Sequence, residues 1–280
     1  MSETSKINMG EATLSSTPKS PLALPEAIMK RAGLFVGQVL VGLVVLAVWY
    51  LTDRYHIIPK IISRSPIDVF RFLVRIAEDG TLWPALYSTL EATIAAFLLA
   101  SVVGVVFGVA LGLFPRVEAL IDPYLNALNA MPRIAFGPVF IIAFGIGQAS
   151  KVALAFSIVV FVMMVNARSG VRMVDRDIMT MARVMNCSRT QMFFKILLPS
   201  AVPSIFAGLR LGLIYSLLGV ITSEIIASRV GLGQLIAWYS GIFQLEGVYA
   251  VVLVLAVVAS LLNMFMSAIE RRLLKGRGVS

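Results

Sequence analysis

The segment ATIAAFLLASVVGVVFGVALGLF, residues 92–114, decides the fold of this chain. It contains no charged side chain, and at about 1.5 Å per residue a helix of this length crosses a bilayer core of roughly 30 Å. Residues 34–52 and 247–269 meet the same requirement. Three weaker candidates are residues 134–150, 152–167 and 200–227, the last with Arg210 inside it. The sequence therefore predicts an all-α integral membrane protein with six transmembrane helices.

The composition excludes an ordinary soluble domain. Hydrophobic residues make up 59% of the 280 residues, charged residues make up 14%, and the mean hydropathy is +0.90, whereas soluble domains average about 25% charged residues. The net charge of +9 sits in loops and tails, where the positive-inside rule explains it, so no nucleic acid partner is expected. Because Cys187 and His56 are the only residues of their kinds, neither an intrachain disulfide nor a histidine-cluster metal site can form.

The distribution of Lys and Arg predicts the orientation in the membrane. Six crossings place both termini on one side, and most basic residues lie on that side, so both termini are expected in the cytoplasm. We expect a disordered cytoplasmic tail at residues 1–33, a transmembrane domain at 34–272 and a basic cytoplasmic tail at 273–280. Lys151 is assigned to an external loop. Another external loop, residues 53–83, is expected to hold an amphipathic helix at the membrane surface, with apolar residues at helical spacing: Ile67, Phe70, Leu73 and Val74.

Glycines spaced four residues apart indicate where helices pack. The second and fifth predicted spans carry such glycines: Gly104, Gly108, Gly112, Gly208 and Gly212. Because glycine lets another backbone approach closely, we interpret both faces as packing contacts. Gly137-Pro138 is expected to break the third span, and a break at membrane depth is tolerated only against protein or a water-lined cavity. The third span is therefore expected to border a pathway.

The stretch between the fourth and fifth spans, residues 168–199, predicts a cytoplasmic helix–turn–helix. The first helix is amphipathic, with apolar residues at i, i+3, i+4 and i+7: Ile178, Met181, Ala182 and Met185. Asn186 follows, and asparagine is the non-glycine residue that best adopts a left-handed backbone after a helix. Residues 188–191, Ser-Arg-Thr-Gln, predict a capping box for a second helix that ends at Pro199. We interpret this stretch as a surface held by another protein; the alternative is a hairpin lying on lipid.

The same stretch resembles the EAA loop of bacterial ABC importer permeases. The family pattern is Glu-Ala-Ala, three residues, Gly, nine residues, Ile, one residue and Leu-Pro. This chain keeps the spacing with Thr180-Met181-Ala182, Asn186, Ile196, Leu198 and Pro199. Thr180 replaces the glutamate, which removes whichever ATPase contact that glutamate makes in relatives, while Asn186 replaces the glycine and keeps the turn chemistry. Residues 126–135, 207–210, 223–224 and 231–233 are also similar to permeases of nitrate, sulfonate and taurine importers.

The resemblance implies the type I ABC importer permease architecture, in the inner membrane of a bacterium. It implies that the chain is no enzyme but forms the translocation pathway for a small solute, as a homodimer surrounded by membrane lipid. The implied partners are a dimer of ABC ATPase subunits and an external or periplasmic substrate-binding protein. The chain itself is expected to bind no cofactor and no metal, because ATP and Mg belong to the ATPase, and it lacks a Gly-x-x-x-x-Gly-Lys-Ser/Thr loop. The implied cargo is an anion resembling nitrate, a sulfonate, taurine or an organic acid, although relatives also carry neutral heterocycles.

Two groups of residues are candidates for function. Those expected to couple the chain to the ATPase surround the turn of the loop: Ala182, Arg183, Met185, Asn186, Cys187, Ser188 and Arg189. Polar residues in or near spans are candidates for the pathway or its gate: Ser101, Asn129, Arg133, Arg210, Ser216, Thr222 and Glu224. For Arg133 and Glu224, the alternative to substrate contact is a role as an interfacial anchor or in an ion pair that stabilises a gate. Arg210 could instead brace the EAA loop. The alternative function is an ion-gradient-driven secondary transporter, which needs carboxylates deep in the spans and an internal repeat.

Overall fold

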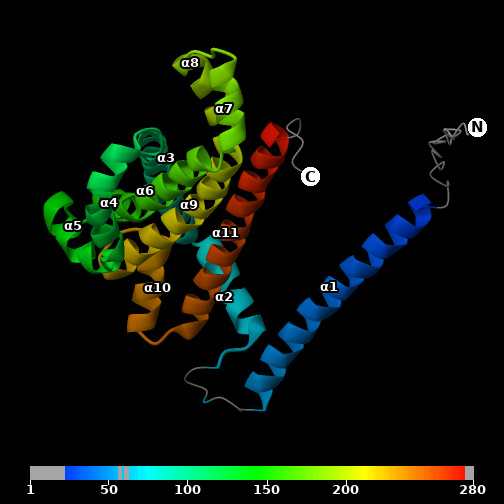
Figure 1. Ribbon diagram of the computed structural model, residues 1–280. Helices are drawn as coiled ribbons and strands as arrows, with labels where there is room; N and C mark the ends of the chain where they lie inside the picture. Colours follow the sequence, from blue (N-terminus) through cyan, green and yellow to red (C-terminus); the bar gives the residue numbers. More distant parts are fainter. Residues whose placement is uncertain (1–22, 56–58, 60–62, 275–280) are drawn as a thin grey trace, which may run out of the picture. The chain divides into compact units, whose positions relative to one another are not determined.

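The computed structural model describes residues 23–55, 59 and 63–274, and within them every regular element is a helix, with no strand. The chain divides into two compact units, residues 1–58 and 59–280, and each is described by itself (Figure 1). Five helices are long and apolar enough to cross a membrane, or up to six when one bent pair of helices counts as a span. The all-α class predicted from the sequence is confirmed.

The first unit contains one described helix, α1 (Ala23–Arg54). Its segment Val36–Arg54 has the length and hydropathy of a span, as predicted for residues 34–52. Because α1 begins at Ala23, residues 23–33 are helical rather than part of a disordered tail, and residues 1–22 lie outside the described residues. At the other end of the chain, α11 (Leu245–Leu274) includes the first residues of the predicted tail 273–280, of which 275–280 are not described. His56 is also outside the described residues.

Three helices form the core of the second unit: α3 (Leu82–Leu113), α6 (Gln148–Arg172) and α9 (Leu198–Ile226). The predicted glycine faces are where these helices meet. A Cβ atom on Gly108 would lie 2.3 Å from the Met164 carbonyl oxygen, and one on Gly212 would lie 3.1 Å from the Met163 sulfur. The other glycines of the pattern also abut α6: Gly104, Gly112 and Gly208. The predicted packing contacts are confirmed, since only residues without side chains allow these backbone approaches.

The third crossing differs from the span predicted at residues 134–150. It consists of α4 (Pro115–Ala130), the short 3-10 turn η1 (Arg133–Phe136) and α5 (Gly137–Phe144), and its two halves are bent by 78°. The break lies at Met131-Pro132, because a residue before proline avoids the helical region, and Met131 is extended with ψ 136°. The prediction of a break at Gly137-Pro138 is wrong, since these residues begin α5. Residues 148–150 belong to α6.

The end of the second unit that carries α10 (Leu232–Gly241) lies opposite the end that carries α7 (Arg176–Val184) and α8 (Arg189–Met192) (Figure 1). The predicted amphipathic helix is α2 (Pro66–Glu78). Its buried residues are Val69, Phe72 and Ile76, and the Phe72 ring meets Tyr239 of α10 edge-on at 5.2 Å. Of the residues predicted to form its apolar stripe, Ile67, Phe70 and Val74 are exposed and Leu73 is half-buried. The position of α2 at a membrane surface stays a prediction.

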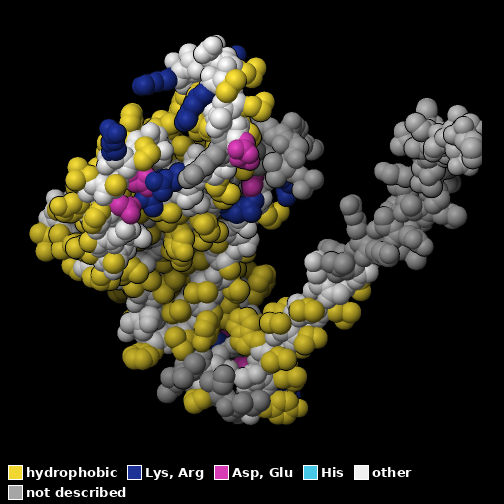
Figure 2. Space-filling model, viewed as in Figure 1, with side chains coloured by type: hydrophobic (Ala, Val, Ile, Leu, Met, Phe, Trp, Pro, Cys, Tyr) yellow, Lys and Arg dark blue, Asp and Glu magenta, His cyan; other side chains and the backbone are white. Residues whose placement is uncertain are grey.

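Charged and hydrophobic side chains occupy different parts of the second unit. Figure 2 shows a broad band of hydrophobic side chains over the helices, with Lys and Arg gathered toward the end that bears α7 and α8. The positive-inside rule associates such a basic end with the cytoplasm.

Candidate functional site

The loop between α6 and α9 begins with a helix that is capped at both ends. The Asp175 carboxylate accepts a hydrogen bond from the Asp177 N–H at 2.8 Å and starts α7. The helix ends in a Schellman turn. Asn186 has φ 54° and donates its N–H to the Arg183 carbonyl, while Cys187 donates to the Ala182 carbonyl, both at 3.0 Å. The left-handed backbone predicted for Asn186 is confirmed.

The second half of the loop starts with the predicted capping box. Ser188 Oγ accepts a hydrogen bond from the Gln191 N–H at 3.2 Å, and the Gln191 side chain accepts one from the Ser188 N–H at 2.9 Å. The prediction that Pro199 ends this helix is wrong, because the helical run continues through the wide turn η2 (Phe193–Leu197) into α9. The Leu198 N–H reaches the Phe193 carbonyl, five residues back. Such a π-type turn accommodates a proline, whose ring clashes with the carbonyl four residues before it.

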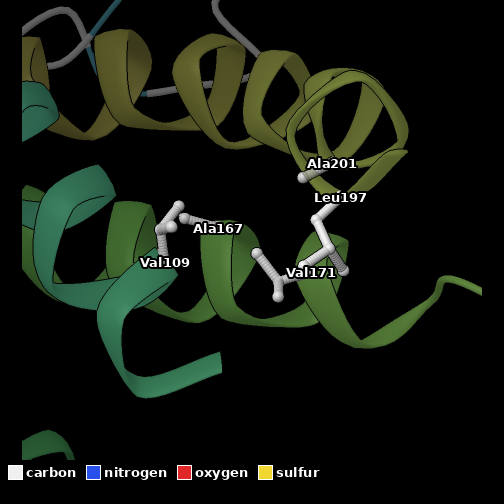
Figure 3. Close-up of a cluster of buried hydrophobic side chains, with 5 residues drawn as sticks. All are labelled: Val109, Ala167, Val171, Leu197 and Ala201. Atoms are coloured by element: carbon white, nitrogen blue, oxygen red, sulfur yellow. The ribbon is translucent and has the colours of Figure 1, made fainter. Parts of the chain in front are cut away.

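The inner side of this loop packs on the ends of the core helices. Residues of α3, α6 and the η2–α9 segment form a buried cluster (Figure 3): Val109, Ala167, Val171, Leu197 and Ala201. Met179 of α7 and Phe193 of η2 pack against this cluster. At the same level, a Cβ atom on Gly170 of α6 would lie 2.9 Å from the Ala201 carbonyl oxygen. Through these contacts α7 rests on the ends of α6 and α9.

The outer side of the loop is apolar and exposed. The exposed fraction is 65% for Met181, 78% for Val184 and 71% for Met185, and Arg183 and Arg189 beside them are also exposed. We call these five residues the α7–α8 surface.

The remaining residues predicted for coupling differ in their exposure. Ala182 is 4% exposed and its side chain faces inward. Cys187 is half-buried, and Asn186 and Ser188 are exposed. The Ala182 side chain therefore cannot contact a partner directly, whereas Asn186 and Ser188 are accessible.

A cluster of four charged residues links this end of α6 to α4. Arg168 contacts Glu118 at 3.2 Å and Asp122 at 2.6 Å, and Arg172 also pairs with Glu118, which is only 4% exposed. The sequence reasoning missed these pairs. The two acids and the two arginines are each four residues apart, which places each pair on one helix face and is a signal that could have been found. The cluster fastens the first half of the bent crossing to the helix that leads into α7.

The opposite ends of α3, α6 and α9 are joined by a buried polar network. Lys151 Nζ lies 2.9 Å from Glu224 Oε1, and 3% and 0% of the two side chains are exposed. Thr89 Oγ and the Gly233 N–H each donate to the Glu224 carboxylate at 2.9 Å, and Lys151 also donates to Ser88 Oγ at 2.9 Å. The assignment of Lys151 to an external loop is wrong, because Glu224 compensates its charge inside the bundle. An ion pair was one interpretation of Glu224; a gating role stays a prediction.

Three of the pathway candidates lie around one cavity. Asn129, Arg133 and Thr222 line a cavity of about 320 Å³, together with Tyr215 and other residues of α9 and α6. A second cavity of about 430 Å³ shares Arg133 as a lining residue. Its other walls are rich in aromatic side chains: Phe136, Phe140, Phe144, Phe156 and Phe161.

The other pathway candidates are engaged in helix packing. Ser216 is buried and donates a hydrogen bond to the Thr93 carbonyl at 2.8 Å, which ties α9 to α3. Ser101 is buried within α3. Arg210 pairs with Glu270 of α11, so it braces α9 against α11 and lines neither of the two cavities.

Comparisons with known proteins agree with this fold. Residues 82–275 match the model of the family described as the binding-protein-dependent transport system inner membrane component. The chain is 31% identical to the taurine transport system permease protein TauC of Escherichia coli K12, over 84% of this chain and 87% of TauC. It is 33% identical to the riboflavin transport system permease protein RibX of Chloroflexus aurantiacus, over 78% of this chain and 81% of RibX.

Among solved structures, inward-facing conformations of the MetNI methionine ABC transporter contain a chain with the same fold. The TM-score is 0.61 at 18% identity, and the match covers 69% of this chain and 97% of that one. The fold is therefore that of the type I ABC importer permeases. Since the family model covers most of the chain, this protein belongs to the inner-membrane components of binding-protein-dependent transport systems, which are multi-pass permease subunits of ABC transporters and not enzymes.

Proposed function

We propose that this chain carries a small anion across the bacterial inner membrane and is driven by a separate dimer of ATPase subunits. The observation that supports the coupling is that α7 has one face packed on the core helices and another apolar face that is exposed. Its inner side packs on the core helices through Met179, while Met181, Val184 and Met185 are exposed. Burial of a large apolar side chain contributes roughly 1.5–3 kcal/mol. A partner that covers the α7–α8 surface therefore gains a substantial stabilisation.

In this proposal the ATPase holds the α7–α8 surface from the cytoplasmic side. The three apolar side chains enter a groove on the ATPase, and Arg183 and Arg189 pair with acids at its rim. The cluster in Figure 3 connects α7 to α6 and α9, and Glu118 connects α6 to α4. A movement of the ATPase therefore turns the helices that border the cavity at Arg133. ATP and Mg are bound by the ATPase and not by this chain.

A second copy of this chain completes the pathway in our proposal. One face of α9 exposes residues at helical spacing: Leu211, Tyr215, Leu218 and Ile225. Tyr215 and Leu218 also line the cavity, so a copy seated on this face encloses the cavity between the two chains. The outer hydrophobic surface of the homodimer then faces membrane lipid.

The cargo is proposed from the relatives and from the cavity. TauC is named for taurine, a sulfonate, and RibX for riboflavin, so a neutral heterocycle is the alternative to an anion. The cavity favours an anion, because Arg133 is its charged residue and no carboxylate lines it. An external substrate-binding protein delivers the solute to the outer end of the homodimer.

An ion-gradient mechanism has less support than an ATPase. Secondary transporters of that kind use carboxylates near the pathway. Glu224 is enclosed with Lys151, and neither of the two cavities is lined by Asp or Glu.

Substitution of Asn186 tests the coupling role of the loop. A β-branched residue is strained at φ 54°, so Asn186→Val opens the turn and changes the shape of the α7–α8 surface. We expect this variant to insert in the membrane, keep ATP hydrolysis by the partner and lose most uptake in proteoliposomes that contain the binding protein and the ATPase. Asn186→Gly is the matched control and retains uptake, because glycine fits the left-handed position. Full uptake by Asn186→Val refutes the coupling role.

A further inference from the structure

Arg133 differs from the cations of α6 and α9 in having no acidic partner. The cations of α6 and α9 all contact a carboxylate: Lys151, Arg168, Arg172 and Arg210. Among the described residues, no Asp or Glu forms an ion pair with Arg133. A guanidinium at membrane depth is costly unless protein, water or an anion solvates it. Its positive charge is thus available to a ligand.

The contacts of Arg133 hold the guanidinium in place without neutralising it. Nη2 donates to Asn129 Oδ1 at 2.8 Å, and Nη1 donates to the Ile158 carbonyl oxygen at 3.2 Å. The Phe161 ring centroid lies 4.0 Å from Cζ. These partners are all uncharged, and because a guanidinium has five N–H groups, donors remain for a further acceptor.

The cavity at Arg133 has the lining expected of a small oxyanion site. Its volume of about 320 Å³ is within the range of small-molecule sites. Apart from the guanidinium, its polar side chains are the Asn129 amide and the hydroxyls of Tyr215 and Thr222. The amide and the Tyr215 hydroxyl can donate hydrogen bonds. A fixed guanidinium with neighbouring donors and no acid recognises sulfonates, carboxylates and phosphates.

We propose that Arg133 binds the sulfonate or carboxylate group of the solute as it passes through the cavity. Anions are then selected at membrane depth as well as at the external binding protein. The inference rests on the proposed function, in which this cavity belongs to the pathway. A lipid phosphate offers the same oxyanion chemistry. The competing structural role is helix capping, since Nη2 also lies 3.5 Å from the Leu128 carbonyl near the end of α4.

The test measures binding to the full chain, co-purified with its ATPase in nanodiscs of the neutral lipid phosphatidylcholine. The probe is methanesulfonate, and the control probe is dimethyl sulfone, an uncharged molecule of similar shape. Saturation-transfer difference NMR on the methyl protons detects weak binding. Arg133→Gln removes the charge and Arg133→Lys keeps it. Arg210→Gln is the matched control, because Arg210 is a paired cation outside the cavity.

We expect the unmodified chain to bind methanesulfonate and not dimethyl sulfone. Arg133→Gln should weaken methanesulfonate binding roughly tenfold or more, because charge-assisted hydrogen bonds are lost. Arg133→Lys should cause a smaller loss of affinity, since the ammonium is a point charge and lacks the paired N–H groups of the guanidinium. Arg210→Gln should leave the affinity unchanged. Equal affinity of the unmodified chain and Arg133→Gln overturns the proposal and leaves helix capping as the role of Arg133. Absence of binding to the unmodified chain overturns it as well.

Nanodiscs that contain phosphatidylglycerol separate the two sources of the anion. If the solute is the ligand, methanesulfonate affinity is the same in both lipids. If a headgroup occupies the cavity, phosphatidylglycerol displaces methanesulfonate from the unmodified chain but not from Arg133→Gln, and this outcome overturns the solute proposal. Failure of the proposed function is recognised separately, because the ATPase would then co-purify equally well after the α7–α8 surface is altered, whatever Arg133 binds.

Discussion

Replacement of Glu224 by glutamine removes one charge of the buried Lys151–Glu224 pair and leaves the Lys151 ammonium alone. The two side chains are 0% and 3% exposed, so water cannot replace the lost partner. Ser88 Oγ and the Val230 carbonyl still accept hydrogen bonds from Lys151, at 2.9 and 2.6 Å, but neither carries a charge. Breaking a buried ion pair on one side typically costs about 3–5 kcal/mol of unfolding free energy. We expect Glu224→Gln to fall in this range.

The removal of both charges should be less harmful than the removal of either one. In Lys151→Met/Glu224→Gln no unpaired charge remains, so its unfolding free energy should exceed that of each single variant. The assay is equilibrium unfolding in mixed micelles of dodecyl maltoside and SDS, followed by far-UV circular dichroism. Arg71→Gln is the matched control, because its pair with Asp68 is 4.0 Å long and its side chain is 75% exposed, and it should cost less than about 1 kcal/mol. Additive losses in the double variant would contradict this reasoning.

Three further variants probe the packing and the linkage. Gly108→Val should prevent close contact of α3 and α6, since even a Cβ atom would lie 2.3 Å from the Met164 carbonyl oxygen. Gel filtration should then find little monodisperse protein. The control Gly241→Ala, whose Cβ would have no atom within 4 Å, should elute as monodisperse protein. Gly231→Ala should lower the melting temperature, because its Cβ would lie 2.1 Å from Glu224 Oε1; an unchanged melting curve would argue against the network. Glu118→Gln should reduce uptake severalfold while ATP hydrolysis continues. The charge exchange Glu118→Arg/Arg172→Glu should restore part of the lost uptake. Normal uptake by Glu118→Gln would exclude the linkage of α4 to α6 from transport.

Features that depend on neighbouring residues could be predicted from the sequence. The long uncharged segments gave α3 and α11, because a helix needs only its own backbone to satisfy hydrogen bonds in a membrane. The turn at Asn186 and the capping box at Ser188 were also predictable, since their hydrogen bonds span at most five residues. These local motifs shape the loop between α6 and α9.

Features that depend on partners far along the chain were missed. Lys151 is buried because Glu224, 73 residues away, compensates its charge, and no local pattern indicates such a pair. No part of a span was predicted at residues 115–130, because the segment is polar. Its residue Asp122 is paired with Arg168 of another helix. For the pathway, residue type alone could not separate Ser216, which packs against α3, from Thr222, which lines the cavity.

The central claim is that the α7–α8 surface is held by an ATPase on the cytoplasmic side, and the labelling of a cysteine at Met185 tests it most directly. In a Cys187→Ser background, Met185→Cys presents a single thiol at a position that is 71% exposed. The measurement is its reaction with a membrane-impermeant maleimide in inside-out vesicles, with and without bound ATPase subunits. We predict rapid labelling of stripped vesicles and strong protection once the ATPase rebinds. Labelling from the outer face of the membrane, or equal labelling with and without the ATPase, would contradict the account.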